Sequence, residues 1–127
     1  TNAYSLGVLN IACPDMVAHT GDIAKTKQAI LAADKALGNL AKVAQQTNAY
    51  LLITADHGNA EELLEKNTTE INTEHSLYPV PFIIFGQNLT NAKLEHGVLA
   101  DVAPTILTLL DIPKPPEMTG TNLYLPK

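Results

Sequence analysis

Residues able to bind a divalent cation occur in three separate stretches of this chain. In chain order they are Asp15, His19, Asp56, His57 and His75. The set offers two carboxylates and three imidazoles, which suits transition-metal ions such as Zn²⁺ or Mn²⁺. The sequence therefore predicts a metal site that gathers side chains from distant parts of the chain.

Asp15 and His19 are separated by three residues. On a helical turn, positions i and i+4 share one face, so a single ion can reach both side chains. The neighbouring Pro14 and Gly21 fit a loop-to-helix transition equally well. The alternative interpretation is that Asp15 caps a helix and that His19 is an incidental surface residue.

Asp56 and His57 follow an apolar run and would point to opposite faces of a regular strand. They can converge only where the chain turns, and Gly58-Asn59 supplies residues typical of a turn. Open α/β sheets bind ligands at the carboxyl ends of their strands, which favours a site here. The alternatives are a capped loop with a solvent-facing His57 and, for His75 taken alone, an ordinary surface position.

The remaining reactive side chains give weaker signals. Ser5 and Ser76 are the two serines, and nothing in the sequence marks either as activated, so we expect no catalytic nucleophile in this chain. His96 lies in a turn-like stretch outside the three metal-binding segments. Cys13 is interpreted as a small, half-buried packing residue beside the site, with a thiolate metal ligand as the alternative.

Composition excludes several classes of function. The formal net charge is −5 and the eight basic residues are all scattered lysines, which argues against nucleic-acid binding. A single cysteine excludes an intrachain disulfide framework. No apolar run reaches the roughly 20 residues of a membrane span, and no signal peptide opens the sequence. We expect a cytoplasmic protein that binds neither nucleic acid nor membrane, with 127 residues forming one domain.

Alternating short apolar runs and one long amphipathic segment predict an α/β arrangement. A buried strand over 4–11, a helix over 22–46 and a second strand over 49–54 would form a right-handed βαβ unit. Because the first strand would begin almost at Thr1, the pattern also indicates a truncated domain.

The second half of the sequence predicts shorter elements. We expect a short helix over 60–65, an exposed loop over 66–74, and a third strand over 80–85 whose start is restricted by Pro79 and Pro81. A helix should then run from Asp101, as its N-cap, to about residue 110, followed by a proline-rich loop.

Longer strings of sequence resemble one enzyme family. N-I-A-C-P-D-M-V-A-H-T-G, L-I-T-A-D-H-G-N-A-E and E-H-S-L-Y-P-V-P-F are similar to segments of cofactor-independent phosphoglycerate mutases, as are L-A-D-V-A-P-T-I-L-T-L-L and E-M-T-G-T near the end. The resemblance spans nearly the whole chain in the expected order. It departs at Cys13, where the family often has Asn, and at Ala18, where Gly is common.

The resemblance implies an alkaline-phosphatase-like three-layer sandwich, here a partial domain with a mostly parallel sheet flanked by helices. Residues 1–127 would be the C-terminal portion of its metal-binding phosphatase-like domain. In the complete enzyme two Mn²⁺ ions are expected, with Zn²⁺, Co²⁺ or Mg²⁺ as substitutes. By this resemblance Asp15, His19 and His75 match the ligands of one ion, and Asp56 and His57 match ligands of the other.

The implied activity is that of a glycolytic isomerase. The family interconverts 3-phosphoglycerate and 2-phosphoglycerate through a phosphoserine intermediate, and the complete enzyme is expected to be a monomer. The motifs that carry its nucleophilic serine, an N-terminal aspartate and the inserted substrate domain are not found in these 127 residues. The chain alone is therefore expected to be inactive and able to self-associate.

Two other functions fit the same residues. A related metallophosphatase or phosphopentomutase would share the Asp and His pairs but not the longer strings around Asp15 and Asp56. A non-catalytic metal-binding or assembly module would fold alone and could pair exposed sheet edges with another copy.

Overall fold

The computed structural model describes residues 4–65, 68–87, 89 and 92–126. The chain divides into two compact units, which we call the large unit (residues 8–87) and the small unit (residues 1–7 and 88–127). Every metal-binding residue predicted from the sequence lies in the large unit.

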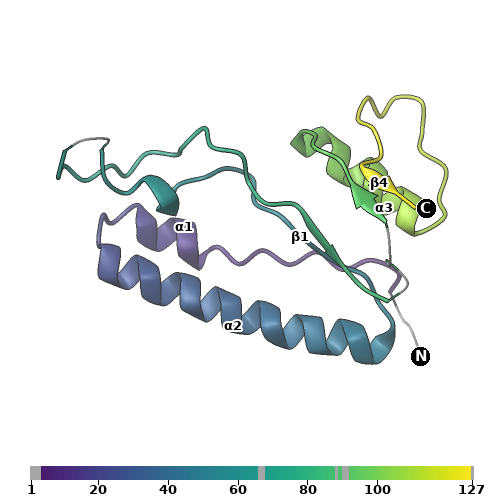
Figure 1. Ribbon diagram of the computed structural model, residues 1–127, viewed down its shortest axis with the longest axis horizontal. Coiled ribbons are helices and arrows are strands. Elements are labelled where there is room, and N and C mark those ends of the chain that lie inside the picture. The colour runs from purple at the N-terminus through teal and green to yellow at the C-terminus, as the bar shows by residue number, and fades with distance from the viewer. Residues whose placement is uncertain (1–3, 66–67, 88, 90–91, 127) are drawn as a thin grey trace. The chain divides into compact units, whose positions relative to one another are not determined.

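Among its described residues, the large unit has two helices, one 3₁₀ turn and two strands (Figure 1). In chain order these are α1 (Cys13–Ala18), α2 (Ile23–Thr47), β1 (Leu51–Ile53), η1 (Ala60–Glu62) and β2 (Ile83–Phe85). Helix α2 confirms the predicted helix over 22–46. The predicted helix over 60–65 is shorter, because only η1 forms there.

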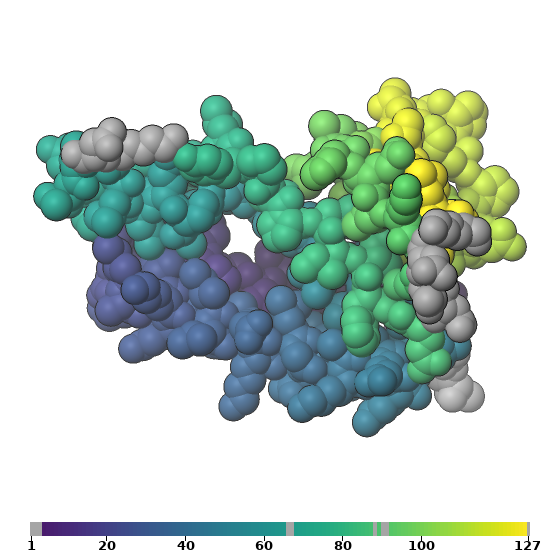
Figure 2. All heavy atoms as spheres, viewed as in Figure 1, coloured from purple at the N-terminus to yellow at the C-terminus, as the bar shows by residue number. Residues whose placement is uncertain are grey.

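Clear capping signals define both ends of α2. The Asp22 carboxylate accepts the Lys25 N–H at 2.9 Å, which satisfies one of the free donors of the first turn. Asn48 ends the helix in the left-handed conformation with φ 55°, as asparagine tolerates. Helix α2, whose blue atoms form the lower edge of the view in Figure 2, packs mainly against α1, and apolar side chains such as Leu31 and Val43 remain exposed on it.

The short sheet of the large unit differs from the predicted parallel arrangement. Strand β1 pairs antiparallel with β2, in the register that places Leu52 opposite Ile84. The predicted restriction on the start of β2 is confirmed. The strand begins only after Pro79 and Pro81, because proline has no N–H to donate to a neighbouring strand.

The predicted buried strand over 4–11 is wrong for this structure. That segment is described throughout, forms no strand and is drawn as an extended tube before α1 (Figure 1). Tyr4 is 88% exposed and Val8 90% exposed. A continuous apolar run is stable as a strand only when neighbouring strands pair with it and layers cover both faces, and this segment has neither here.

The small unit is built around one helix. It comprises β3 (Lys93–Leu94), η2 (Leu99–Asp101), α3 (Val102–Leu109) and β4 (Tyr124–Leu125). The helix ends near the predicted residue 110. The proline-rich tail, predicted to be only a loop, instead returns to form β4, which pairs antiparallel with β3.

Asp101 is the N-cap residue of α3, as predicted, but its side chain makes no capping hydrogen bond to that helix. The helical path already begins at η2, and the Asp101 carboxylate reaches back to accept the Val98 N–H at 2.8 Å and across to accept the Thr121 N–H at 2.7 Å. These two hydrogen bonds hold the pKa of Asp101 below its ordinary value. The side chain therefore fastens the returning tail to the start of the helix.

The loop predicted over 66–74 agrees with the structure where the structure describes it. Lys66 and Asn67 lie outside the described residues, and residues 68–74 form neither a helix nor a strand. No helix among the described residues is both long enough and apolar enough to cross a membrane.

Candidate metal centre

Helix α1 presents Asp15 and His19 together. His19 is the C-terminal cap of the helix, and its N–H donates to the Asp15 carbonyl at 3.1 Å. This helical turn brings His19 Nε2 to 3.4 Å from Asp15 Oδ1. Both side chains are partly exposed, so they can reach a cation that arrives from solvent.

An isolated β-bridge brings His57 close to His75. Gly58 and Ser76 form an antiparallel bridge in which the Ser76 N–H donates to the Gly58 carbonyl at 2.8 Å. The preceding residues of the two segments are the histidines, and their rings stack with centroids 3.6 Å apart. The chain bends at Asp56 and His57, just before the turn predicted at Gly58-Asn59, and Gly58 itself pairs with the segment that carries His75.

Both pairs meet at Asp15. His75 Nε2 lies 3.4 Å from Asp15 Oδ1 and 3.1 Å from His19 Nε2. Potential ligand atoms of Asp15, His57 and His75 also lie within 4.8 Å of one another. One carboxylate and three imidazoles from three stretches therefore gather within the large unit.

The hydrogen bonds of His19 favour its use as a ligand. His19 Nδ1 lies 2.8 Å from the Thr73 carbonyl, an acceptor, so Nδ1 must carry the hydrogen. In the neutral ring, Nε2 then keeps its lone pair and directs it toward Asp15 and His75. His57 Nδ1 similarly lies 3.3 Å from the Gly58 carbonyl. This nitrogen and carboxylate donor set fits a transition-metal ion.

The pKa of Asp15 is held below its ordinary value, which keeps the carboxylate ionised. The hydrogen bond donated by Asn59 has the largest effect, partial burial acts in the opposite direction, and the three nearby imidazoles add smaller contributions. An ionised carboxylate is the form that binds a cation.

The other residues singled out in the sequence are not members of this cluster. The Asp56 side chain is 84% exposed, and its Oδ2 lies 3.5 Å from Nε2 of His57 at the edge of the cluster. His96 belongs to the small unit. Cys13 is exposed, which corrects the expected half-buried position, and its Sγ lies 3.9 Å from the Ala29 carbonyl.

Three residues near the cluster were not predicted to matter. Asn59 Nδ2 donates to Asp15 Oδ1 at 2.8 Å, and the Asn59 N–H donates to Glu61 Oε2 at 3.0 Å. The Ser76 hydroxyl donates to the other oxygen of Glu61. The turn signal Gly58-Asn59 followed closely by an acid could have indicated the local part of this network, but not its contact with Asp15.

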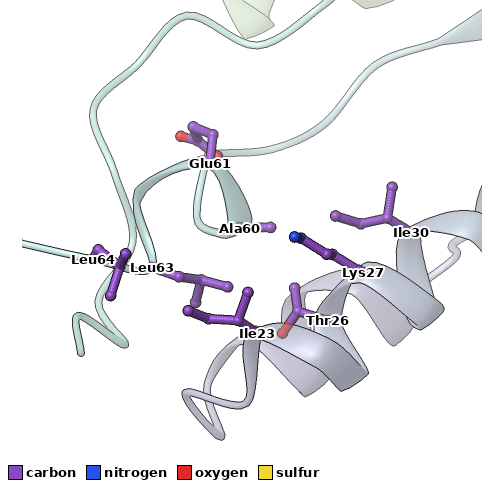
Figure 3. A pocket seen from close by; sticks show the side chains of 8 residues that line it. All are labelled: Ile23, Thr26, Lys27, Ile30, Ala60, Glu61, Leu63 and Leu64. Carbon is purple, nitrogen blue, oxygen red and sulfur yellow. The ribbon is translucent and has the colours of Figure 1, made fainter. Parts of the chain in front are cut away.

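A hollow of about 230 Å³ lies on the neighbouring side of η1, against α2. Its lining is largely apolar, from residues such as Ile23, Ile30 and Leu63. In Figure 3, Lys27 reaches from α2 toward Ala60, whereas Glu61 stands on the other side of the turn. Glu61 is itself part of the lining, so the acidic side chain that joins the network above also borders this hollow.

Comparison with known proteins first defines the class. The chain belongs to the metalloenzyme superfamily, whose family model matches residues 1–114. Relatives of the chain carry a more specific name, 2,3-bisphosphoglycerate-independent phosphoglycerate mutase. The one from Ehrlichia canis (strain Jake) is 50% identical over 120 residues, covering 94% of this chain and 24% of that protein.

Two further relatives, from other organisms, carry names of the same kind. The protein named 2,3-bisphosphoglycerate-independent phosphoglycerate mutase 2 from Methanosarcina barkeri (strain Fusaro / DSM 804) is 49% identical, covering 96% of this chain and 23% of its own length. The mutase from Clostridioides difficile (strain 630) is 47% identical, with coverage of 91% and 23%. The chain spans about a quarter of the length of the curated relatives it matches.

Proposed function

We propose that this chain is the C-terminal portion of the metal-binding phosphatase-like domain of a cofactor-independent phosphoglycerate mutase. The complete enzyme would act on phosphoglycerate, moving the phosphoryl group between the 3 and 2 positions through a phosphoserine. It would work as a monomer in the cytoplasm. The relatives named above are isomerases of this kind, and the long shared strings favour this substrate over those of related metallophosphatases.

The observation that carries the proposal is the meeting of Asp15, His19, His57 and His75 in one cluster. We assign Asp15, His19 and His75 to one Mn²⁺ ion, and Asp56 and His57 to a second ion completed by residues outside this chain. The mixed carboxylate and imidazole donors suit Mn²⁺. Zn²⁺, Co²⁺ or Mg²⁺ could bind in its place, each suiting these donors to a different degree.

Bound ions would supply electrostatic stabilisation of the transferred phosphoryl group and would lower the pKa of a serine hydroxyl. The chain's own residues prepare the site for this. His19 turns its Nε2 lone pair inward by donating Nδ1–H to Thr73, and Asp15 stays ionised through its hydrogen bond from Asn59.

We further propose that the complete domain is an alkaline-phosphatase-like three-layer sandwich with a mostly parallel sheet. The exposed apolar run over 4–11 supports this, because such a run is typical of a strand that pairs with others and is covered on both faces. In that setting residues 1–127 would contribute one portion of a larger sheet.

Calorimetric titration with Mn²⁺ tests the metal assignment. The wild-type chain should bind Mn²⁺ weakly, and His19→Ala should lose at least tenfold in affinity, because it deletes a ligand rather than an outer-shell partner. His96→Ala, in the small unit, is the matched control and should bind like wild type. Equal affinities for wild type and His19→Ala would contradict the assignment.

Activity assays test the relation to the complete enzyme. The isolated chain should not convert 3-phosphoglycerate to 2-phosphoglycerate, since the nucleophilic serine is assigned to sequence outside it. Conversion that survives replacement of both Ser5 and Ser76 by alanine would refute this. Preferential turnover of generic phosphoesters by the complete enzyme would instead favour a related metallophosphatase.

A further inference from the structure

We propose that Asn59 is a positioning residue that holds the Asp15 carboxylate in its metal-binding orientation, and that Glu61 and Ser76 lock Asn59 in place. The proposal deepens the function proposed above and depends on the metal site assigned there. It concerns residues that touch no ion themselves.

Asn59 is buried, and only half of its side-chain amide is hydrogen-bonded. The residue is 5% exposed, and its Nδ2 donates to Asp15 Oδ1 at 2.8 Å. Its other amide atom, Oδ1, is buried without a hydrogen-bond partner, the single such side-chain atom among the residues that the structure describes. An unpaired buried acceptor is destabilising, so a residue kept only for packing would not need this amide.

The side-chain amide of Asn59 can bind Asp15 in only one of its two orientations. Turning it over would place Oδ1 against a carboxylate oxygen of Asp15, and two acceptors would then repel each other. With Nδ2 facing Asp15, the donated hydrogen bond fixes the rotation of the carboxylate. Residues that hydrogen-bond to ligating carboxylates commonly orient them for the metal in this way.

Asn59 is itself held in place by Glu61, which is also bonded to Ser76. Glu61 accepts the Asn59 N–H with one oxygen, at 3.0 Å, and the Ser76 hydroxyl with the other. Asn59 is two residues from His57, and Ser76 is next to His75. A Cβ at position 58 would overlap both Glu61 Oε1 and Ser76 Oγ, so Gly58 leaves room for this closure. The network Asp15–Asn59–Glu61–Ser76 therefore ties all three metal-binding segments together.

The test measures metal binding by the full 127-residue chain. Asn59→Ala should weaken Mn²⁺ binding by roughly 10- to 100-fold, the usual effect of removing an outer-shell partner. Asn122→Ala is the matched control, because Asn122 also donates one amide hydrogen bond, to the Tyr124 carbonyl, but in the small unit. It should bind Mn²⁺ like wild type.

A second readout separates positioning from stability. With Co²⁺ at saturation, the visible absorption bands report ligand geometry, and Asn59→Ala should change their position or intensity. A variant with wild-type Co²⁺ bands and wild-type Mn²⁺ affinity would overturn the proposal, whatever its stability. If Asn59→Ala does not fold by circular dichroism, Ser76→Ala decides instead: it should weaken Mn²⁺ binding severalfold, and unchanged binding would overturn the proposal.

The outcome for wild type distinguishes the two levels of inference. If the wild-type chain takes up no Mn²⁺, the assigned metal site fails and the role of Asn59 fails with it. If wild type binds Mn²⁺ and loses affinity in His19→Ala but not in Asn59→Ala, the metal site stands and only the positioning role is refuted.

Discussion

At the scale of single residues, Gly58 is closely surrounded by other side chains, whereas Gly38 has open space beside it. A Cβ on Gly58 would overlap Glu61 and Ser76, whereas a Cβ on Gly38 would meet nothing within 4 Å. Gly58→Ala should therefore destabilise the chain by about 1–3 kcal/mol, because the network around Glu61 must shift. Gly38→Ala, on an exposed position of α2, should stabilise it by about 0.5–1 kcal/mol by removing backbone freedom from the unfolded state.

Urea unfolding of both variants beside wild type checks these opposite signs. The two substitutions add the same methyl group, so each serves as the control for the other. A Gly58→Ala variant as stable as wild type would mean that the close contacts between Gly58, Glu61 and Ser76 do not hold in solution.

Asp101 predicts a specific response to acid. Its pKa lies below the ordinary 3.8 because the Val98 and Thr121 N–H groups donate to the carboxylate. Its stabilising contribution is fully present above pH 3.8 and is lost as the pH falls below that value toward the lower folded-state pKa. Wild type should thus lose stability more steeply than Asp101→Asn below pH 4, as measured by urea midpoints over a pH series. Parallel pH profiles would contradict the assigned role of this carboxylate.

The sequence was a good guide to some residues of the site and a poor guide to others. The i, i+4 spacing indicated that Asp15 and His19 would meet if the segment formed a helical turn, because the geometry of such a turn is local, although it left a loop-to-helix transition equally possible. The contact between Asn59 and Asp15 joins positions 44 residues apart, so no local pattern could predict it. Cys13 was misjudged for the same reason, since its exposure depends on which segments cover α1.

At the scale of elements, Thr105 joins α3 to the chain that returns as β4. Its side chain is fully buried; Oγ1 donates to the Asp101 carbonyl at 2.8 Å and accepts the Leu123 N–H at 2.9 Å. Thr105→Val keeps the shape but leaves the Leu123 N–H without its partner, and should cost about 1–3 kcal/mol. Faster amide hydrogen exchange at Leu123 would report the loss directly.

Thr108→Val provides the matched control on the same helix. Thr108 is exposed, and its hydroxyl donates to the Pro104 carbonyl at 3.1 Å within the helix itself. Its replacement should change stability by no more than about 0.5 kcal/mol. If the two variants protect the Leu123 amide equally well, Thr105 does not hold the tail.

Elements with strong local signals were predictable, and elements that depend on partners were not. The periodic apolar positions and Asn48 at its end predicted α2. Pro79 and Pro81 predicted that the start of β2 would be restricted. The apolar run over 4–11 carries the sequence pattern of a buried strand, but a strand needs neighbours to accept its hydrogen bonds. The two-residue pairing of β3 with β4 is too short to leave any periodic pattern.

At the scale of the whole molecule, this chain leaves much of its apolar surface without cover. Among the described residues, the buried hydrophobic core consists of Ala18, Ala44, Leu63 and Leu123. In the large unit alone, Val8 is 90% exposed, Leu9 66% and Leu77 103%. Exposed apolar surface of this kind is typical of an interface, which agrees with our proposal that more of the domain lies outside these residues.

The isolated chain should therefore associate with itself. Val8 and Leu9 lie on an extended segment whose backbone can pair with that of a second copy. Light scattering should give an apparent mass that rises with concentration above the 13.6 kDa of one chain. The double substitution Val8→Lys and Leu9→Lys should lower this mass, because two charges would be buried on association. Thr68→Lys with Thr69→Lys adds the same charge at exposed polar positions and should not. A mass of one chain at every concentration, or equal effects of the two double variants, would refute association through this segment.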